Sequence, residues 1–511
     1  MKKLICALLV ITMLSPCAAL VSCRSDENSG RTTTTASTTA STTTQKPNDS
    51  SPDNKDENDD DTVANLDHLN GLDFGNKTIN FAVASTENKD YHLRSIYVDE
   101  ESIEVDRVNK AIYERNQKIE KMLNVKIAVS TVKGTVNDTA IETVLLGGSS
   151  EIDIVSASQC NDIEVALEGV IYDLNLLSET NSDYIKWNRR YWASDYIDAL
   201  SFGNKRFWLA GDLSLDYTGS CNAVFVNKAL YDKYYADLYG SIYDLVKRYD
   251  WTYDTFTETA AMYHGSTQGV GLALPVWYNT NAMAVSAGVT YTSINAKGKP
   301  VNNLTESNSS LLGFIEKYHN LINTDGVNSF DPPSLKDKQA MELFASGEAL
   351  FAVGKLDHAA YYLRDMSDGY YVIPAPMLNK DQGAYYSAVE ETLPIYGINI
   401  SSEKIAAAAA TLEAMAYESY FSVRPVFYQD LLNISGSETA DPEALEMLDI
   451  IHDGIYTDLV YLWKCTEDLD GMLFFLSSTV STEDYDPKLT NKENRWANGL
   501  KEILKKIEAV Q

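Results

Sequence analysis

Hydrophobic and polar residues first follow a strand-like pattern and then a helical one, beginning near residue 78. Thr78–Ala84 is mostly apolar and rich in β-favouring residues, so it predicts a strand. Apolar residues then recur at three-, four- and seven-residue intervals, which predicts one face of a helix. They are Val105, Val108, Ile112, Ile119 and Met122. Val125–Thr131 predicts the next strand, and together the three elements form a βαβ unit that implies a parallel sheet.

The same alternation of strands and helices continues through the chain. A helix over Asn137–Leu146, ended by two glycines, and a strand over Ile152–Ala157 complete a β-α-β-α-β opening. From about Asn204 we expect further strands over Lys205–Ala210, Asn222–Asn227, Gly271–Pro275, Ala349–Val353, Tyr370–Pro374 and Leu393–Ile400. Expected helices cover Lys228–Tyr239, Thr255–Tyr263 (with Thr252 as N-cap), Ala340–Ser346, Ser402–Tyr417 and most of 426–511.

The first residues of the chain have the pattern of a secretion signal. Lys2 and Lys3 precede an apolar run, Leu4–Leu14, which is too short to cross a bilayer of about 30 Å as a lasting helix. The following Leu20-Val21-Ser22-Cys23 resembles the bacterial lipobox, whose cysteine becomes the lipid-modified first residue of the mature protein. We therefore expect a signal peptide over 1–22 and lipidation, such as palmitate, on Cys23. The alternative is an ordinary signal peptide with a chance cysteine.

A polar segment over residues 23–76 follows the expected cleavage site. It is rich in Thr, Ser and Asp and too poor in apolar residues to offset the entropy of ordering, so it predicts a flexible, disordered tether. Its acidic cluster, Asp59-Asp60-Asp61, lacks the ligand spacing of a calcium loop. Asp468-Leu469-Asp470-Gly471 has two suitable aspartates, but its glycine comes too early and Thr479 stands where the loop needs a glutamate. We predict no metal site.

Composition narrows the classes of function. Against 42 Lys and Arg stand 73 Asp and Glu, and a net charge of −31 disfavours nucleic acid as a partner. After removal of the signal peptide and lipidation of Cys23, only Cys160, Cys221 and Cys465 remain, so at most one disulfide can form and buried thiols are expected. No motif for a bound cofactor is present in the sequence, and none is predicted.

Seven segments in order resemble the extracellular solute-binding proteins of ABC importers, in the maltose-binding-protein-like family 1. They are AIYERNQKIEKMLNVKI (Ala111–Ile127), EIDIVSAS (Glu151–Ser158), NAVFVNKALYDKY (Asn222–Tyr234), DWTYDTFTETA (Asp250–Ala260), FASGEALFAVGKL (Phe344–Leu356), YVIPAPMLNKDQGAYYS (Tyr371–Ser387) and ALEMLDIIHDGIYTDL (Ala444–Leu459). The resemblance implies an α/β fold of type II, with two lobes that are each a mostly parallel sheet flanked by helices and are joined by a hinge. Lobe 1 would comprise 77–211 and 375–425, and lobe 2 would comprise 216–370 and 426–511. The crossings would fall near Ala210–Asp216 and Tyr371–Pro376.

The same resemblance suggests ligand-binding positions in lobe 2. Trp277 and Tyr278 follow an expected strand where the family places an aromatic residue in the cleft, and Lys355 and Asp357 lie in a loop that faces ligand. Aromatic faces stack on sugar rings, and carboxylates bond to hydroxyls. The alternatives are core packing for the aromatics and a surface ion pair for the charges. Lys355 stands where the family often has Trp or Pro, which leaves an acidic or amidated sugar open.

Five further positions lie at the ends of expected strands or crossings, where ligands of open parallel sheets bind. Ser158 and Gln159 follow the third strand, with a helix N-cap as the alternative. Asp216 and Tyr217 follow the first crossing, and Tyr386 follows the return crossing. Asp153 lies inside a strand and is expected to be a structural hydrogen-bond acceptor.

These features together predict a function. The expected protein is a monomeric, lipid-anchored receptor on the extracellular face of the cell membrane. It captures a carbohydrate, an oligosaccharide or a similar solute, and delivers it to the permease subunits of an ABC importer. It is not expected to be an enzyme. The alternatives are a surface carbohydrate-active enzyme, which would need two carboxylates about 5–10 Å apart, and a sensory or adhesive lipoprotein without a transport partner.

Overall fold

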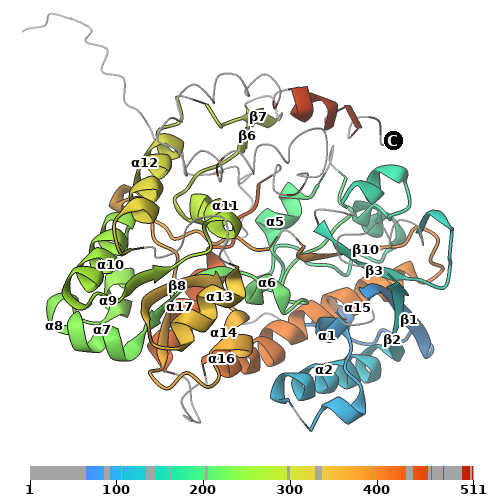
Figure 1. Ribbon diagram of the computed structural model, residues 1–511. Coiled ribbons are helices and arrows are strands. Elements are labelled where there is room, and N and C mark those ends of the chain that lie inside the picture. Colours follow the sequence, from blue (N-terminus) through green and yellow to red (C-terminus); the bar gives the residue numbers. More distant parts are fainter. Residues whose placement is uncertain are drawn as a thin grey trace, which may run out of the picture. The chain divides into compact units, whose positions relative to one another are not determined.

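Two four-stranded sheets organise the protein in a computed structural model (Figure 1). The structure describes residues 65–85, 93–104, 106–133, 145–159, 163–201, 205–295, 300–305, 307–327, 336–390, 392–432 and 441–458, with scattered positions between 462 and 509. The described residues all belong to one compact unit. The expected signal peptide, Cys23, residues 24–64 of the expected tether and the aspartates near Asp468 lie outside them, as does most of the helix expected over Asn137–Leu146. The last part of the expected tether, residues 65–76, is folded instead, because it forms the short helix η2 (Asp67–Leu69) and buries Leu66 and Leu69.

The first sheet has the strand order β10-β3-β1-β2. β1 (Lys77–Ser85) pairs in parallel with β2 (Val125–Lys133) and with β3 (Ile154–Ser158). β10 (Pro394–Ile398) pairs antiparallel with β3 and closes that side of the sheet. The βαβ opening predicted from hydrophobic periodicity is therefore confirmed, and the sheet is completed by a strand from much later in the chain.

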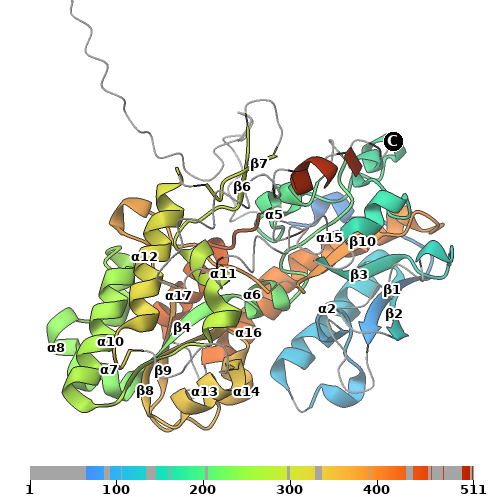
Figure 2. The same cartoon turned by 45° about the horizontal axis from the view of Figure 1, so that its top comes forward.

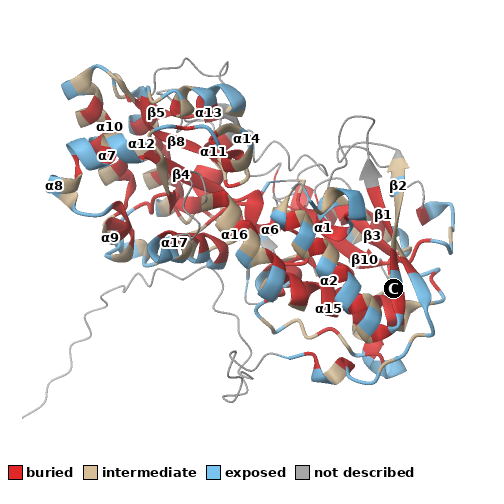
Figure 3. Ribbon diagram, turned by 90° about the horizontal axis from the view of Figure 1, so that it is seen from below, coloured by how far each residue is buried: buried red, intermediate tan, exposed pale blue. Residues whose placement is uncertain are grey.

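Two long helices pack against the first sheet and each other. α2 (Arg107–Leu123) begins at Asp106, whose side chain accepts hydrogen bonds from the amides of Val108 and Asn109, and ends at Asn124 in the left-handed region. The helix buries Val108, Ile112 and Ile119 of the predicted apolar face, and Leu123 is buried in place of its neighbour Met122, which is only partly buried. Val105 lies outside the described residues. α15 (Ile405–Glu418) is almost entirely buried, as the red ribbon shows in Figure 3, because its small alanines allow close packing on both sides.

The second sheet has the strand order β5-β8-β4-β9. β4 (Asn222–Asn227) runs antiparallel to both β8 (Ala349–Lys355) and β9 (Tyr370–Pro374), and β5 (Val270–Ala273) runs parallel to β8. The expectation of a mostly parallel sheet thus holds for the first sheet, whereas the second is mixed because β4 runs against both of its neighbours.

Short and medium helices surround the second sheet. They are α7 (Lys228–Tyr234), α8 (Ala236–Tyr239), α9 (Ile242–Lys247), α10 (Tyr253–Thr267), α11 (Val276–Ser286), α12 (Ser309–Asn323), α13 (Asp337–Ala345), α14 (His358–Tyr362) and α17 (Pro442–Asp453). The predicted N-cap of α10 is confirmed, because the Thr252 side chain accepts from the Thr255 amide. The single helix expected over Lys228–Tyr239 is instead two helices, since the backbone leaves the helical region at Tyr235.

The remaining elements are short. α1 (Leu93–Ile96), α5 (Ser194–Ala199) and α6 (Asp216–Gly219) are helices of one or two turns. The strands β6 (Thr292–Ile294) and β7 (Pro300–Asn302) form a separate antiparallel pair. The strand expected over Lys205–Ala210 forms only isolated bridges, one of them from Leu209 to Tyr396 of β10. Its Trp208 packs over Gly397 of the same strand, so side-chain packing replaces a continuous ladder.

The first connection between the sheets turns sharply at Gly211. Its φ is +150°, and a Cβ atom there would lie 2.5 Å from the carbonyl oxygen of Tyr191, so only glycine fits. The next residue, Asp212, is buried and faces two cations, with Oδ1 at 3.3 Å from Nε2 of His452 and 3.6 Å from Nη1 of Arg424. Burial opposes the charge of His452, but the Asp212 carboxylate outweighs it and raises the pKa of His452 to about 9. Charged pairing therefore fixes this connection to α16 (Arg424–Leu432) and α17.

A second connection is one long helical run (Figures 1 and 2). α15 continues through the π-helical segment η7 (Ser419–Val423) into α16 (Arg424–Leu432). α15 contacts β1 and β10 of the first sheet, and α16 contacts α2, which packs on the first sheet, as well as α14 and α17, which flank the second. A third connection, residues 375–393, leads from the end of β9 to the start of β10.

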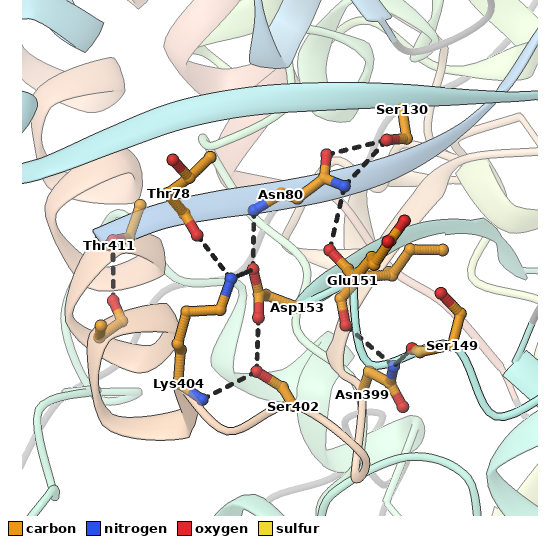
Figure 4. A network of polar contacts seen from close by, with 12 residues as sticks. Thr78, Asn80, Ser130, Ser149, Glu151, Asp153, Asn399, Ser402, Lys404 and Thr411 are labelled. Atoms are coloured by element: carbon orange, nitrogen blue, oxygen red, sulfur yellow. Dashed lines mark hydrogen bonds and ion pairs between the residues drawn. The ribbon is translucent and has the colours of Figure 1, made fainter. Parts of the chain in front are cut away.

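Asp153 anchors the far end of the first sheet (Figure 4). Its buried carboxylate accepts hydrogen bonds from the Asn80 amide at 2.9 Å and from the hydroxyl of Ser402 at 2.5 Å, and it pairs with Nζ of Lys404 at 2.6 Å. The network ties β1, the start of β3 and the loop before α15 together. Asp153 is a structural acceptor, as its position inside a predicted strand indicated.

Candidate binding site

The starts and ends of three strands meet at one edge of the second sheet. Asn222, the first residue of β4, pairs with Lys355, the last residue of β8. The residues before β4 and after β8 are therefore neighbours, and the amide of Asp357 donates to the carbonyl of Gly219 in α6 at 2.9 Å. This register brings together the loop of Lys355 and Asp357 and the short helix that begins at Asp216.

Five charged residues gather at this edge, and we call them the Asp357 cluster: Asp216, Asp337, Lys355, Asp357 and Glu390. Nζ of Lys355 lies 2.9 Å from Oε2 of Glu390, and this pair links the second sheet to the connection that leads to β10. Burial opposes the charge of Lys355, but the surrounding carboxylates outweigh it and raise its pKa. The lysine is therefore a firmly charged member of an acidic group.

Asp357 occupies the least favourable position in the cluster. Its Oδ1 atom is buried and has no hydrogen-bond partner among the described residues. Burial raises the pKa of Asp357 to about 7, and the three neighbouring carboxylates reinforce the shift against the opposing charge of Lys355. A buried carboxylate oxygen without a partner costs stability, and a residue with such a shifted pKa is a candidate for ligand binding.

An exposed aromatic ring borders the cluster. Tyr361 of α14 is 70% exposed, the largest exposed fraction among the large hydrophobic residues described. Tyr361 lies one helical turn after Asp357, and desolvation of its hydroxyl, together with the charges of Asp357 and Asp216, raises its pKa. An aromatic face beside carboxylates is the combination that polyhydroxylated ligands use.

Gln159 and Ser158 lie at the corresponding edge of the first sheet. Both are buried, and the side-chain amide of Gln159 donates to the backbone carbonyl of Glu390 at 3.0 Å. The hydroxyl of Tyr196 donates to Oε1 of Gln159. Ser158 pairs with Pro394 at the start of β10. Gln159 thus positions the backbone of a cluster residue from the opposite sheet.

Tyr217 points into a different environment from its neighbour Asp216. Its ring is buried and lies edge-on to Tyr196 at 6.2 Å and to His452 at 5.6 Å between centroids. Burial, reinforced by Asp212, raises its pKa well above the usual value. Tyr217 packs beside the charged pairing of the first connection.

Trp277 and Tyr278 lie in the first turn of α11, at the same edge of the second sheet as the cluster. Their positions follow from β5, which runs parallel to β8 and ends just before this helix. They follow a strand, as the sequence predicted, and Val276 begins the helix that carries them. The next residue, Asn279, is buried, and its amide donates to Oδ1 of Asp337 at 3.4 Å.

Tyr386 packs away from the cluster's charges. Its ring lies 6.2 Å from that of Tyr456, and both pack against the buried Ala282, Val285 and Ala388. Burial raises its pKa. The predicted residues thus fall into two sets, with Asp216, Lys355 and Asp357 close together and Tyr217 and Tyr386 in separate packing environments.

Sequence reasoning missed Asp337, Asn279 and Tyr361 as members of the site. Tyr361 had a detectable signal, since it follows Asp357 by one helical turn. Asp337 and Asn279 had none, because a single sequence does not show that α13 and α11 begin side by side.

Neither a metal-binding group nor a surface thiol is found among the described residues. They contain no group of three or more His, Cys, Asp or Glu side chains that could hold a metal ion together. Cys221 is a buried free thiol whose Sγ lies 3.3 Å from the carbonyl oxygen of Tyr217. Cys160 and Cys465 lie outside the described residues.

Solved structures resemble this chain although no protein-family model and no curated protein sequence matches it. Maltose-bound MalE3 of T. maritima is 13% identical with a TM-score of 0.51, over 83% of this chain and 99% of that chain. The substrate-binding protein Lmo0181 of an ABC transporter from Listeria monocytogenes, in complex with cycloalternan, is 15% identical with a TM-score of 0.53, over 84% and 99%. The galacto-N-biose- and lacto-N-biose I-binding protein of Bifidobacterium longum is 13% identical with a TM-score of 0.53, over 84% of this chain and 98% of that chain.

These likenesses show the fold of the chain. The chain has the two-lobed, type II α/β fold of the solute-binding proteins of ABC importers. Its particular fold is that of the maltose-binding-protein-like members, so the resemblance drawn from the seven sequence segments is confirmed at the level of the fold. The neighbours are binding proteins by their descriptions rather than enzymes. Within the part of the chain described, no helix is long and apolar enough to cross a membrane.

Proposed function

We propose that this protein is an extracellular, lipid-anchored receptor that binds a carbohydrate between its two lobes and delivers it to the permease of an ABC importer. The observation that carries the proposal is the fold, which is shared with proteins solved in complex with maltose, cycloalternan and lacto-N-biose. The Asp357 cluster and the exposed ring of Tyr361 supply the hydrogen-bonding and stacking groups that such a ligand needs.

The proposed binding residues are those at the two facing sheet edges. Asp216, Lys355 and Asp357 would bond to hydroxyls, and the first turn of α11 would bring Trp277 and Tyr278 toward the ligand. Gln159 and Ser158 would support the site through the backbone near Glu390. Tyr217 and Tyr386 would act by packing. The lobe boundaries expected from the sequence, 77–211 with 375–425 and 216–370 with 426–511, belong to the same proposal.

A ligand screen tests the binding function. The purified protein is mixed with a panel of neutral mono- and oligosaccharides, and thermal unfolding is recorded for each. A ligand that binds only the folded state stabilises it by about 2.7 kcal/mol at a hundred times its Kd, which raises the unfolding temperature. We expect at least one saccharide to do so in the wild type and not in the variant Asp357→Ala. No shift with any saccharide would refute the proposal.

The same mixtures distinguish the receptor from an enzyme. A buried acid with a pKa near 7 beside other carboxylates is also a feature of glycosidases. Chromatography of the labelled saccharide after long incubation should recover it intact. Release of shorter products would favour the carbohydrate-active enzyme instead.

Anchoring through Cys23 needs a separate experiment. Cells of a bacterium that lipidates such proteins are grown with labelled palmitate, and the protein is followed in membranes and in the medium. We expect the wild type to be labelled and membrane-bound, and Cys23→Ser to be unlabelled. Equal membrane retention and labelling of the variant would exclude Cys23 as the anchor.

A further inference from the structure

The Asp357 cluster holds more negative charge than it can neutralise. It contains four carboxylates and one ammonium group, so three negative charges are uncompensated when all are ionised. Lys355 already pairs with Glu390 at 2.9 Å. Among the described residues, no Lys or Arg forms an ion pair with Asp216, Asp337 or Asp357. The cluster therefore lacks a second cation, which its three remaining negative charges would attract.

The neighbouring basic groups do not supply that cation. Arg94, whose charge also acts on Tyr361, is paired with Asp106 at 2.8 Å. His358 follows Asp357 directly, but burial and the charge of Lys355 lower its pKa to about 3, so its ring is neutral. Its Nδ1 instead accepts a hydrogen bond from the Lys355 amide at 3.3 Å.

One oxygen of the cluster is poised for an incoming donor. Oδ1 of Asp357 is buried without a hydrogen-bond partner in the described structure. Its position beside Asp216 and Asp337, which carry no ion pair, makes a positively charged donor much more favourable than a neutral one. Binding of such a donor would remove both the unmet hydrogen bond and the repulsion between the carboxylates.

The geometry also limits what kind of cation fits. The described acids do not converge into a group that could chelate a metal ion. An organic ammonium group needs only one or two carboxylates and gains from an aromatic face, which the exposed Tyr361 offers at the border of the cluster. An acidic sugar, which the sequence left open, would meet three carboxylates that form no ion pair within the described structure, and Lys355 is already paired with Glu390.

We propose that the solute bound at the Asp357 cluster carries a protonated amino group, as in an amino sugar, and that Asp357 is the residue that recognises it. This inference rests on the proposed function and specifies its substrate class. The ammonium group donates to Oδ1 of Asp357, while the sugar ring lies against Tyr361. The hydroxyls of the ring bond to the remaining carboxylates of the cluster.

Matched saccharides test the inference. Glucose, galactose and mannose are compared with their 2-amino-2-deoxy counterparts, and cellotriose is compared with the glucosamine trimer and the N-acetylglucosamine trimer of the same β-1,4 linkage. Isothermal titration calorimetry at pH 7 keeps the amines largely charged and does not protonate most of the Asp357 carboxyl, whose pKa is about 7. In the pair that binds most tightly, we expect the amine to bind at least about tenfold better than the hydroxyl or N-acetyl compound, which is the gain of one charge-assisted hydrogen bond.

Two variants locate the preference. Asp357→Asn keeps the shape of the side chain and removes its charge, so it should abolish the tenfold preference for the amine. Asp237→Asn, on the exposed surface of α8, removes the same charge elsewhere and should retain the preference. The ranking by the wild type does not depend on how well either variant folds.

The outcomes separate this inference from the proposed function. Equal or tighter binding of the neutral member of the tightest pair would overturn the amine specificity and leave the carbohydrate receptor standing. A preference that persists in Asp357→Asn would overturn the role of Asp357. Failure of all these saccharides and of the neutral panel would refute the receptor function and the inference with it.

Discussion

Replacing Asp357 with Asn should stabilise the unliganded protein, and more so as the pH rises. The carboxyl has a pKa of about 7 in the folded protein against 3.8 for an unperturbed aspartate. Between these values the folded state binds a proton that the unfolded state releases. The contribution of this group to stability therefore falls as the pH rises through this range.

The size of the effect follows from the two pKa values. Proton linkage gives a loss of about 2.5 kcal/mol between pH 5 and pH 8 in the wild type that the amide variant does not suffer. Other groups titrate equally in both proteins and cancel in the comparison. At pH 5 the acid is mostly protonated and resembles the amide, so the two proteins should then be closest in stability.

Chemical denaturation followed by tryptophan fluorescence measures this difference. Unfolding of the wild type, Asp357→Asn and the surface control Asp237→Asn is recorded without ligand at pH 5, 6, 7 and 8. The gap between wild type and Asp357→Asn should widen steadily with pH, and the control should track the wild type. A stability difference that stays constant from pH 5 to pH 8 would show that ionisation of Asp357 does not destabilise the folded protein. The inference that its carboxylate lies in an unfavourable, acidic environment would then be wrong.

Three further substitutions probe the frame around the site. Gly211→Ala should lower the free energy of unfolding by at least about 2 kcal/mol, because a Cβ atom would lie 2.5 Å from a carbonyl oxygen. Gly265→Ala, in the last turn of α10, has open space and should raise it by up to about 1 kcal/mol. The charged His452 contributes about 1–3 kcal/mol to the stability of the wild type below pH 6.5, and this contribution is lost as the pH rises through 9. His452→Gln should lack it, so the stability difference between the two proteins should shrink with rising pH, and a pH-independent difference would contradict this. Asp153→Ala should lower the free energy of unfolding by about 3–5 kcal/mol, because Lys404 would lose its buried partner. The control Glu403→Ala, at an exposed neighbouring position, should lower it by less than about 0.5 kcal/mol.

Local patterns predicted the elements whose stability is local. The periodicity of α2 and its flanking strands, and the N-cap of α10, follow from short stretches of sequence, and all were found. The segment Lys205–Ala210 has the apolar character of a strand, but Trp208 fills space over Gly397 and the ladder stops after single bridges. Tertiary packing overrides propensity there.

The site was predictable only in part, for a related reason. Lys355 and Asp357 follow a recognisable buried strand, and Asp216 follows the first crossing that the family resemblance implies, so these positions could be identified from the sequence. Asp337 and Glu390 enter the cluster through register and through a connection that returns from the other sheet. Their charges act on Asp357 through space, and no spacing along the chain records that proximity.

The strand order of the first sheet also determines when the molecule can be completed during synthesis. A chain that ends at Pro374 contains every strand of the second sheet, yet β3 still lacks β10, its antiparallel neighbour on one side. Until Ile398 has been made, that side of β3 offers unpaired backbone groups among apolar residues, which is the kind of edge on which chains aggregate. Truncation or translational pausing between β9 and β10 should therefore be far more harmful to this protein than the same event after α15.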